Sequence, residues 1–490
     1  MPPSQTTPVH AFNHNDALGN HDAVGLSALL QQGKVSATEL ATAALTRLEQ
    51  VNTTLTATTC ISAEKALEKA RLIDKGGNYQ GFRGLPSLLK DNIDWRGHPT
   101  RHGSRATTAE MKNKNSEVAN LFEGLGLVLL GKTKTPEFGL TATTEFTRGE
   151  PARNPWNPAH STGGSSGGSA ALVAAGVVPL AHANDGGGSI RIPAACCGLV
   201  GFKPSRGRLA PNEMAKDLPI NLVSDGVVVR SVRDAATFLH LGEGLYPPSQ
   251  GLKPVGLVSA PSTQRLRIGV FTRSIEGREA PAPVIQAVQD AAELCRSLGH
   301  QVKEIDIPID RQFADDFLLY WAMLAFSLHR AGRFVMGRGF DASQLEPLTL
   351  GLSTHFLNNL WRLPMAMRRL RRFGEAYQTA FNDVDVLLSP VVGHEVPAIG
   401  HLALDLPFEE ARLRLTRFAG FTAAQNIAGA PAMSLPMAVD PSGLPIGVHF
   451  AGPVGSEAAL LGLAYELESA QAFHLLNPLA NEPQAVKKAR

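Results

Sequence analysis

The sequence predicts an α/β protein in which a mostly parallel β-sheet is covered by helices on both faces. Short apolar runs typical of buried strands alternate with helical segments along the 490 residues. A complete strand–helix–strand unit occupies residues 265–308. Strand candidates occur in both halves of the chain, with no internal repeat or low-complexity linker between them. We therefore expect one large domain.

The first 180 residues supply two helices and three strand candidates. One helix is predicted from Asp22 to Gln32, and a second begins at the capping box formed by Ser36 and Glu39 and continues to about Val51. The apolar runs that predict strands are Leu85–Lys90, Leu127–Leu130 and Val177–Leu180.

The second half adds further strands and helices. The strand–helix–strand unit consists of the strand Leu266–Val270, the helix Val284–Leu298 and the strand Val302–Ile307. No G-x-G-x-x-G follows its first strand, so we interpret the unit as scaffold rather than a nucleotide site. The remaining predicted elements are a strand at 384–388, a hairpin of 429–436 and 444–450, and a last helix at 457–473.

The segment 310–383 is helical, lacks strand signals and is rich in large apolar residues, which predicts a helical insertion beside a pocket. Its large side chains fit either an apolar pocket or ordinary core packing: Phe317, Trp321, Met323, Phe326 and Trp361. Its arginines between Arg362 and Arg372 fit a solvated helix face, with a membrane or anion patch as the alternative.

Composition argues against several classes of protein. An apolar fraction of 43% and a charged fraction of 18% are globular values, and a net charge of +2 gives no general attraction for nucleic acid. No run of 18 apolar residues predicts a membrane span, and residues 1–20 fit a mobile arm better than a secretory signal. Residues 476–490 are expected to form a C-terminal tail. Four cysteines without C-x-x-C spacing predict reduced thiols, no metal site and a cytoplasmic location. We therefore expect a small-molecule partner, and the sequence leaves a homodimer open.

Two glycine-rich loops, each with a central serine, carry the main functional signal. Residues 163–169 are GGSSGGS and residues 186–193 are GGGSIRIP, which places Ser165 and Ser189 24 positions apart. A serine oxygen attacks a carbonyl once a base takes its proton, and successive backbone N–H groups in a glycine loop stabilise the resulting oxyanion. Because Ser189 follows three glycines, it is the expected nucleophile.

The residues alone leave the base open. His182 and His160 lie near the loops, as a Ser-His-Asp triad would require, and Lys132 and Lys203 are further candidates. Residues 164–168 also fit the G-x-S-x-G elbow of α/β-hydrolases, but no strand precedes them. A phosphate loop would need a lysine after the glycines, and a flexible linker would not continue into the apolar helix predicted at 170–178.

These loops and their surroundings resemble the amidase signature family. The resemblance covers about residues 20–475 and extends to Leu89–Asp91, Gly131–Thr133, Pro136–Gly139, Gly201–Pro204 and Arg230–Asp234. It implies a large twisted mixed sheet covered by helices on both faces, in a single domain at 21–475 that needs no cofactor. The chain departs from the common family pattern at Ala183-Asn184, at Lys134, and at Gly186, where a larger residue is frequent.

The resemblance also implies a Ser–cisSer–Lys triad, with Ser189 as nucleophile, Ser165 as the cis-serine and Lys90 as base. A lysine acts as a base only when neutral, so burial must lower the pKa of Lys90 from its ordinary value of about 10.4. The Gly164–Ser165 peptide bond is then expected to be cis.

The family also implies roles for the residues around the nucleophile. The backbone N–H groups of Gly186, Gly187 and Gly188 are expected to hold the oxyanion. Asp185 and Arg191 flank this loop, and we interpret them as a structural brace.

The implied activity is hydrolysis of amide C–N bonds through an acyl-enzyme, on a hydrophobic or aryl substrate. Carbamates (urethanes) and esters are substrate variants open to the same triad. The alternative is the glutaminase subunit of a tRNA-dependent amidotransferase, which shares the signature. A non-catalytic scaffold is disfavoured because all three triad positions are present.

Overall fold

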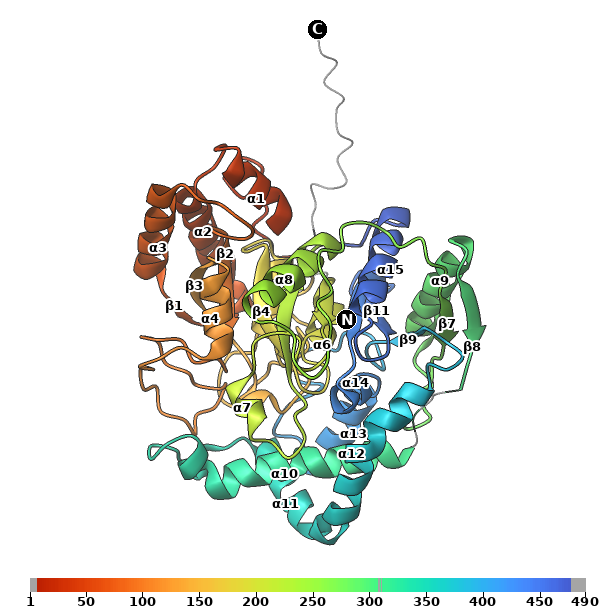
Figure 1. Ribbon diagram of the computed structural model, residues 1–490. Coiled ribbons are helices and arrows are strands. Elements are labelled where there is room, and N and C mark those ends of the chain that lie inside the picture. The colour runs from red at the N-terminus through yellow and green to blue at the C-terminus, as the bar shows by residue number, and fades with distance from the viewer. Residues whose placement is uncertain (1–6, 307–308, 310, 477–490) are drawn as a thin grey trace.

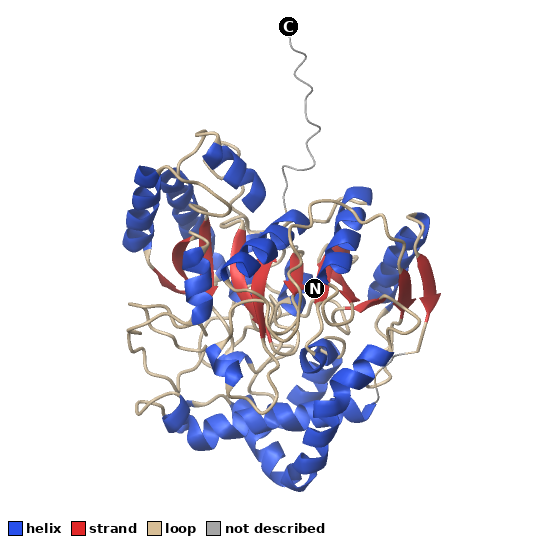
Figure 2. Cartoon of the chain, in the orientation of Figure 1, coloured by secondary structure: helices blue, strands red, loops and turns tan. Residues whose placement is uncertain are grey.

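An eight-stranded mixed sheet runs through the molecule, with helices on both faces and a three-stranded sheet at one end (Figures 1 and 2). The computed structural model describes residues 7–306, 309 and 311–476. In spatial order the large sheet contains β4 (Leu180–Asp185), β6 (Ser224–Val229), β5 (Val200–Lys203), β10 (Ala432–Val439), β11 (Pro445–Ala451), β9 (Val386–Pro390), β7 (Arg267–Val270) and β8 (Gln301–Glu304). The small sheet contains β1 (Thr58–Ile61), β3 (Val128–Thr133) and β2 (Pro86–Lys90).

The mixed sheet confirms the fold implied by the family resemblance, but the expectation of mostly parallel strands is wrong. Among the described strands, parallel pairing joins only β7 to its neighbours β8 and β9, and β2 to β3. The other pairs in the large sheet are antiparallel. A helix between two strands predicts parallel pairing only when the strands become neighbours. Here β6 lies between β4 and β5, and β10 and β11 form a hairpin.

The helices that flank the sheets are α1 (Ala23–Gln31), α2 (Ala37–Leu55), α3 (Ala63–Gly76), α4 (Glu117–Gly124), α5 (Gly167–Ala174), α6 (Arg191–Cys197), α7 (Glu213–Lys216), α8 (Val232–Leu245), α9 (Ala282–Ser297) and α15 (Glu457–Ala470). The predicted capping box opens α2, where Ser36 and Glu39 bond each other's backbone N–H groups. The prediction of a strand at Val177–Leu180 is wrong, because β4 begins only at Leu180 and continues through polar residues to Asp185.

The predicted helical segment lies beyond the ends of the strands and forms the lower part of Figure 1. It contains α10 (Arg311–Val335), α11 (Pro347–Asn359) and α12 (Leu363–Thr379), and α13 (Phe408–Phe418) and α14 (Ala423–Ala428) follow after β9. Residues 307, 308 and 310, at the end of the predicted strand and the start of this segment, lie outside the described residues.

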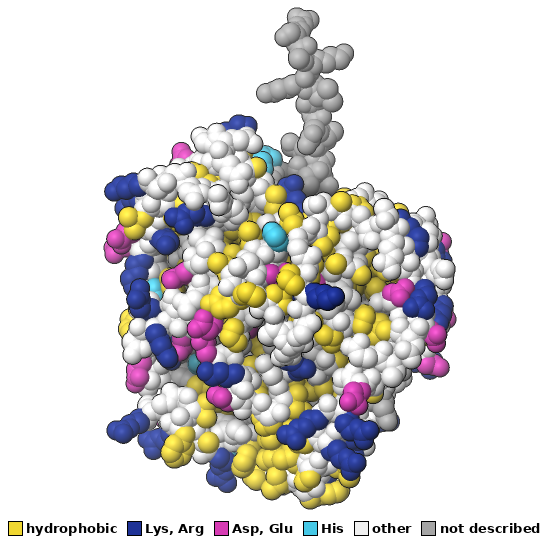
Figure 3. All heavy atoms as spheres, in the orientation of Figure 1, with side chains coloured by type: hydrophobic (Ala, Val, Ile, Leu, Met, Phe, Trp, Pro, Cys, Tyr) yellow, Lys and Arg dark blue, Asp and Glu magenta, His cyan; other side chains and the backbone are white. Residues whose placement is uncertain are grey.

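The exposure of Trp361 and the ion pairs of the arginines decide between the alternatives left open for this segment. Trp361 is 80% exposed, so it belongs neither to the core nor to a pocket. Arg369 pairs with the buried Asp316, and Arg362 lies 3.6 Å from Asp315, so the arginine-rich face of α12 is partly a brace for α10. On the face shown in Figure 3, cationic and anionic side chains are interspersed, in keeping with the small net charge.

The prediction of a mobile arm at residues 1–20 is wrong for residues 7–20, which the structure describes, because these residues pack against the rest of the molecule. Phe12 and Leu18 are buried, and the backbone N–H of Ala11 donates to the carbonyl of Ala175 at 2.8 Å. Arg47 on α2, itself buried, reaches Asp16 at 2.6 Å. Residues 1–6 and all but the first residue of the tail at 476–490 lie outside the described residues.

The sequence also predicted no membrane span, no metal site and no disulfide, and the structure bears on these three points only for the residues that it describes. No helix there is long and apolar enough to cross a membrane. Within the same residues no cluster of His, Cys, Asp or Glu is arranged to hold a metal ion. The four cysteines are free thiols.

Candidate active site

Lys90 occupies the last position of β2, where that strand meets β4 of the large sheet. Every residue of β2 is buried, and Lys90 is completely enclosed. Two hydrogen bonds fix β2 against β4. The hydroxyl of Ser87 donates to the carbonyl of Leu180 at 3.1 Å, and the backbone N–H of Lys90 donates to Nδ1 of His182 at 3.3 Å. The strand therefore delivers the lysine side chain into the interior between the two sheets.

The amine of Lys90 has two polar partners. Its Nζ lies 2.7 Å from Oγ of Ser165 and 2.7 Å from Oδ1 of Asn184. Burial lowers the pKa of Lys90 from 10.5 to about 7, although the carboxylates of Asp225 and Asp185 act in the opposite direction. A large fraction of Lys90 is therefore neutral near pH 7, and a neutral amine accepts a proton from a neighbouring hydroxyl.

The first serine loop holds Ser165 against this amine. The Gly164–Ser165 peptide bond is cis, which confirms the expected geometry. Gly164 lies so close to the backbone of Thr143 that a Cβ atom on it would be 2.7 Å away, so only glycine fits. The neighbouring Ser166 donates from its hydroxyl to the carbonyl of Asn184 at 3.3 Å, as expected for a serine that supports the site rather than attacking.

The second serine loop follows directly on β4 and is braced by Asp185 and Arg191, as predicted. One oxygen of Asp185 accepts from the N–H of Gly188 at 2.6 Å and the other from that of Ile190 at 3.1 Å. Burial alone would raise the pKa of Asp185, but the guanidinium of Arg191, 2.9 Å away, holds that pKa well below its usual range. The brace therefore fixes both sides of Ser189. Further buried partners anchor Arg191 to the C-terminal part of the chain: Gln425, Asn426 and His449.

The brace changes which N–H groups of this loop are free. Because Gly188 donates its N–H to Asp185, that group is already engaged. The N–H groups of Gly186, Gly187 and Ser189 make no hydrogen bond to any other described residue. The carbonyl of Gly187 accepts from the hydroxyl of Thr422 at 2.6 Å, so the peptide between Gly187 and Gly188 is held at its carbonyl by Thr422 and at its N–H by Asp185.

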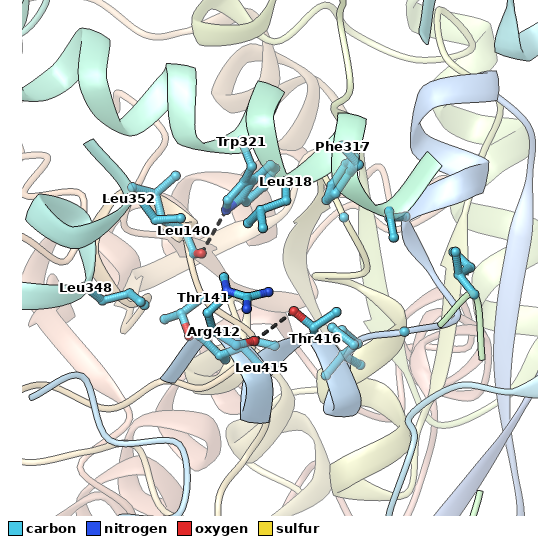
Figure 4. A pocket seen from close by; sticks show the side chains of 18 of the residues that line it. Leu140, Thr141, Phe317, Leu318, Trp321, Leu348, Leu352, Arg412, Leu415 and Thr416 are labelled. Atoms are coloured by element: carbon cyan, nitrogen blue, oxygen red, sulfur yellow. Dashed lines mark hydrogen bonds between the residues drawn. The ribbon is translucent and has the colours of Figure 1, made fainter. Parts of the chain in front are cut away.

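A largely apolar pocket opens beside both serines. Its volume is about 990 Å³ including the open mouth, and Gly187 and Ser189 form part of its wall. Gly139 also lines it, and a Cβ atom on Gly139 would be 3.1 Å from Oγ of Ser165. The remaining wall comes mostly from the helices of the predicted insertion and from α13 (Figure 4).

Two of the aromatic residues singled out from the sequence line this pocket. They are Phe317 and Trp321, whose rings stack with centroids 5.5 Å apart. The indole N–H of Trp321 donates to the carbonyl of Leu140 at 2.9 Å (Figure 4). Met323 and Phe326 are absent from the wall and pack among neighbouring helices.

The other candidate bases have different partners. Both ring nitrogens of the buried His182 are engaged, one by the backbone of Lys90 and the other by Asp225 at 3.0 Å, and burial lowers its pKa. Lys132 pairs with Asp91 at 2.7 Å, and Lys203 donates to the carbonyl of Pro204 at 2.9 Å.

His160 lies apart from the lysine amine. Its backbone pairs with Ala398 in an isolated bridge, and among the described residues its ring makes no hydrogen bond to either serine. Of the bases considered from the sequence, Lys90 is therefore the one bonded to a loop serine.

Three residues of the site were not identified from the sequence as parts of it. Asn184 bonds the lysine amine, Asp225 orients His182, and Thr422 fixes the second serine loop from a position 233 residues after Ser189 in the chain. The departure from the family pattern at Ala183-Asn184 was the one available signal, since it places an amide where a smaller residue is usual.

Comparison with known proteins agrees with this geometry. The sequence model of the Amidase family matches residues 39–461. The chain belongs to the amidase family. This amidase is 46% identical over 464 residues to a protein of Mycobacterium tuberculosis (strain ATCC 25618 / H37Rv) named amidase AmiC, covering 94% of this chain and 97% of the relative. It is 33% identical over 474 residues to a glutamyl-tRNA(Gln) amidotransferase component of Synechococcus sp. (strain CC9311), covering 90% and 95%.

A solved structure shows the same fold as this amidase. The structure of 6-aminohexanoate cyclic dimer hydrolase complexed with substrate superposes with a TM-score of 0.84 at 30% identity, covering 96% of this chain and 99% of that one. The amidase family, the amidase-named relative and this structure support the same conclusion, that this amidase is a hydrolase of amide C–N bonds.

Proposed function

We propose that this amidase cleaves its substrate through a serine acyl-enzyme, with Ser189 as nucleophile, Ser165 as proton carrier and Lys90 as base. The observation that supports this assignment most directly is the 2.7 Å contact between Nζ of Lys90 and Oγ of Ser165 inside a fully buried site. Ser189 supplies the second hydroxyl at the pocket that Gly139 and Ser165 adjoin.

In the first step neutral Lys90 takes the proton of Ser165, and Ser165 takes that of Ser189. The oxygen of Ser189 then forms a bond to the carbonyl carbon of the amide, and the negative charge develops on the carbonyl oxygen. We assign the oxyanion to the unengaged N–H groups of Gly186, Gly187 and Ser189, with Gly188 orienting the loop through Asp185. Each such donor contributes about 3–4 kcal/mol to stabilising the transition state.

The tetrahedral intermediate collapses when the C–N bond breaks. The proton held by Lys90 returns through Ser165 to the leaving nitrogen, so the amine departs neutral and an ester to Ser189 remains. Water then attacks this ester, giving its proton to the same relay, and the free acid leaves. The cycle restores all three side chains and needs no cofactor.

The pocket favours a hydrophobic or aryl substrate, because aromatic and branched side chains form most of its wall. Carbamates and esters present the same carbonyl to Ser189 and are expected as further substrates. The glutaminase alternative requires an acidic and a basic group that converge on one α-carbon. The pocket contains one of each, but Glu276 pairs with Arg278 at 3.6 Å and Arg412 pairs with Glu409 at 2.8 Å.

The test is a panel of an anilide, a primary amide, a carbamate, an ester and glutamine, assayed with the wild type and single variants. Ser189→Ala and Lys90→Met are expected to lose about 10³-fold or more in kcat/KM on the anilide. Lys203→Met is the matched control for Lys90→Met, since Lys203 is equally buried, also has a pKa lowered to about 7 and contacts neither serine.

Two results would contradict the assignment. Retained turnover in Ser189→Ala would exclude that serine as the nucleophile. Equal losses in Lys90→Met and Lys203→Met would show that a buried amine, rather than a base on Ser165, is what matters. Turnover of glutamine with none of the anilide would favour the glutaminase alternative.

A further inference from the structure

A guanidinium group projects into the apolar pocket. Arg412, on α13, is one of the residues that line it, with 30% of its side chain exposed. Figure 4 shows its side chain between Trp321 and Leu318 on one side and Leu415 on the other. A charged group in such surroundings costs free energy unless it finds an opposite charge or hydrogen-bond acceptors.

Part of the guanidinium remains without a partner. Its Nε and Nη2 both approach Oε2 of Glu409, at 2.9 and 2.8 Å, and Glu409 is itself 70% exposed. Nη1 makes no hydrogen bond to any residue in the part of the chain that the structure describes. An arginine has five N–H donors in a planar fork that fits a carboxylate, so Arg412 retains donors for an anionic ligand.

Arg412 is linked to the nucleophile loop through α13 and the residues that follow this helix. Thr422, which holds that loop, comes ten residues after Arg412 in the sequence. The helical part of this interval, from Arg412 to Phe418, spans about 9 Å at about 1.5 Å per residue. Between Arg412 and Thr422 the pocket is lined by Leu415 and Thr416 of α13 and by Ala419 and Gly420 just after it. Apart from Thr416, the pocket wall between Arg412 and Thr422 along the chain is therefore apolar or glycine.

The end of the pocket near the nucleophile loop carries the opposite charge. Glu276 lines the pocket there, in a segment held to the C-terminal side of α13 by the N–H of Ile275, which donates to the carbonyl of Gly420 at 3.4 Å. Oε2 of Glu276 is buried without a hydrogen bond and forms an ion pair at 3.6 Å with Nε of Arg278, whose side chain is 50% exposed. An anionic group is repelled at this end and attracted at the other, which fixes the direction of binding.

We propose that the pocket selects amides whose acyl chain ends in a carboxylate, separated from the scissile bond by an apolar spacer, and that Arg412 binds this carboxylate. This inference rests on the proposed function of Ser189. The spacer packs on the side chains around Trp321 and Leu415, and the carboxylate accepts from Nη1 of Arg412. The substrate class is thus the mono-amides of α,ω-dicarboxylic acids.

Three anilides of equal chain length test this proposal through the release of aniline. One is the mono-anilide of an α,ω-dicarboxylic acid, one is the anilide of the corresponding fatty acid, and one is the anilide of the corresponding ω-amino acid. The wild type is expected to prefer the anionic anilide over the neutral one by about tenfold or more in kcat/KM, mainly through KM, because a charge-assisted hydrogen bond is lost with the neutral chain. The cationic anilide is expected to be the poorest of the three.

Arg412→Met is expected to abolish the preference for the anionic anilide, and Arg412→Lys to retain part of it, since lysine keeps the charge but not the fork. Arg414→Met is the matched control. Arg414 lies on the same helix, is also 30% exposed and pairs with Glu410, but it does not line the pocket. This variant is expected to keep the full preference.

The outcomes distinguish a failure of the proposed substrate class from a failure of the proposed amidase mechanism. If the wild type cleaves all three anilides but prefers the neutral or cationic one, or if Arg412→Met keeps the anionic preference, the substrate class is wrong and the amidase mechanism stands. If the wild type cleaves no anilide and Ser189→Ala behaves identically on every amide tested, the proposed function fails and this inference fails with it.

Discussion

Oδ1 of Asn184, on β4, lies 2.7 Å from Nζ of Lys90, at the end of β2. The side-chain N–H₂ of Asn92 also donates to this oxygen, at 3.2 Å. An amide oxygen only accepts, so it takes one N–H of the neutral lysine amine. We infer that Asn184 is a positioning residue, because this bond turns the lone pair of Lys90 toward Ser165.

Replacing Asn184 by Asp is expected to move the pH dependence of the enzyme. A carboxylate beside Nζ stabilises the protonated amine and raises the pKa of Lys90 above about 7. The base must be neutral to act, so the acid limb of the kcat/KM profile is expected to move upward by about 1–3 pH units. The measurement is the kcat/KM profile on the anilide between pH 5 and 10, with wild type and Asn184→Asp in parallel.

Asn120→Asp provides the control for this shift, since Asn120 lies on α4 at the surface and its side-chain oxygen accepts from the side chain of Asn115. Its profile is expected to match that of the wild type. A uniform loss of rate in Asn184→Asp, with the acid limb unmoved, would mean that Asn184 supports the fold without influencing the base.

Glycine is required at one position of the nucleophile loop and is dispensable at another. Gly188 has a φ of +133°, and a Cβ atom on it would lie 2.3 Å from Oγ1 of Thr422. Gly188→Ala is therefore expected to displace the loop and reduce kcat/KM by about a hundredfold or more. At Gly186 the nearest atom, on Trp321, would be 3.6 Å from the Cβ atom, so Gly186→Ala is expected to keep most of the activity.

The comparison uses kcat/KM on the anilide together with the melting temperature of each variant. Similar losses in the two variants would show that the loop tolerates no side chain at all. In that case the space beside Gly186, where a larger residue is frequent in the family, would have no bearing on activity.

The two serines of the proposed triad could be singled out from the sequence because they lie in glycine-rich loops, and Lys90 followed from the family resemblance. Ser165 and Ser189 need glycines around them for close approach and for turns, and such runs are visible in a single chain. The Gly164–Ser165 cis bond and the burial of Lys90 followed from the family resemblance and are confirmed.

The parts that sequence analysis missed depend on long-range contacts. β4 was not recognised as a strand because its buried side chains include His182, Asn184 and Asp185, which bond partners on other elements instead of forming an apolar run. Arg412 lies in a helix and Thr422 in the turn before the next helix, with no motif around either residue, and only the folded chain brings them to the pocket and the nucleophile loop. The prediction of mostly parallel strands was wrong for the same reason. β6, which comes later in the chain, lies between β4 and β5 in the sheet.

The brace on the nucleophile loop is expected to matter for stability as well as activity. Arg191→Met leaves the buried carboxylate of Asp185 without its cation, which costs about 3–5 kcal/mol in the free energy of unfolding. Urea denaturation followed by circular dichroism measures this change. Arg296→Met removes an exposed pair with Glu293 and is expected to cost less than about 1 kcal/mol. Equal midpoints for the two variants would contradict the role assigned to the brace.

Lys203 offers a test of how buried amines affect stability. Burial, with a smaller effect from Arg191, lowers its pKa from 10.5 to about 7 in the folded chain. Between these values the unfolded chain holds a proton that the folded chain has released, so the contribution of this group to stability rises with pH. Below pH 7 both states are protonated, and the full cost of burying the charge is present. Lys203→Met removes that cost, so its melting temperature relative to the wild type is expected to be most favourable at pH 6 and to decline by pH 9. Lys303→Met, on the exposed face of β8, is expected to show no such trend. A difference for Lys203→Met that is the same at both pH values would mean that the folded chain keeps this amine protonated throughout.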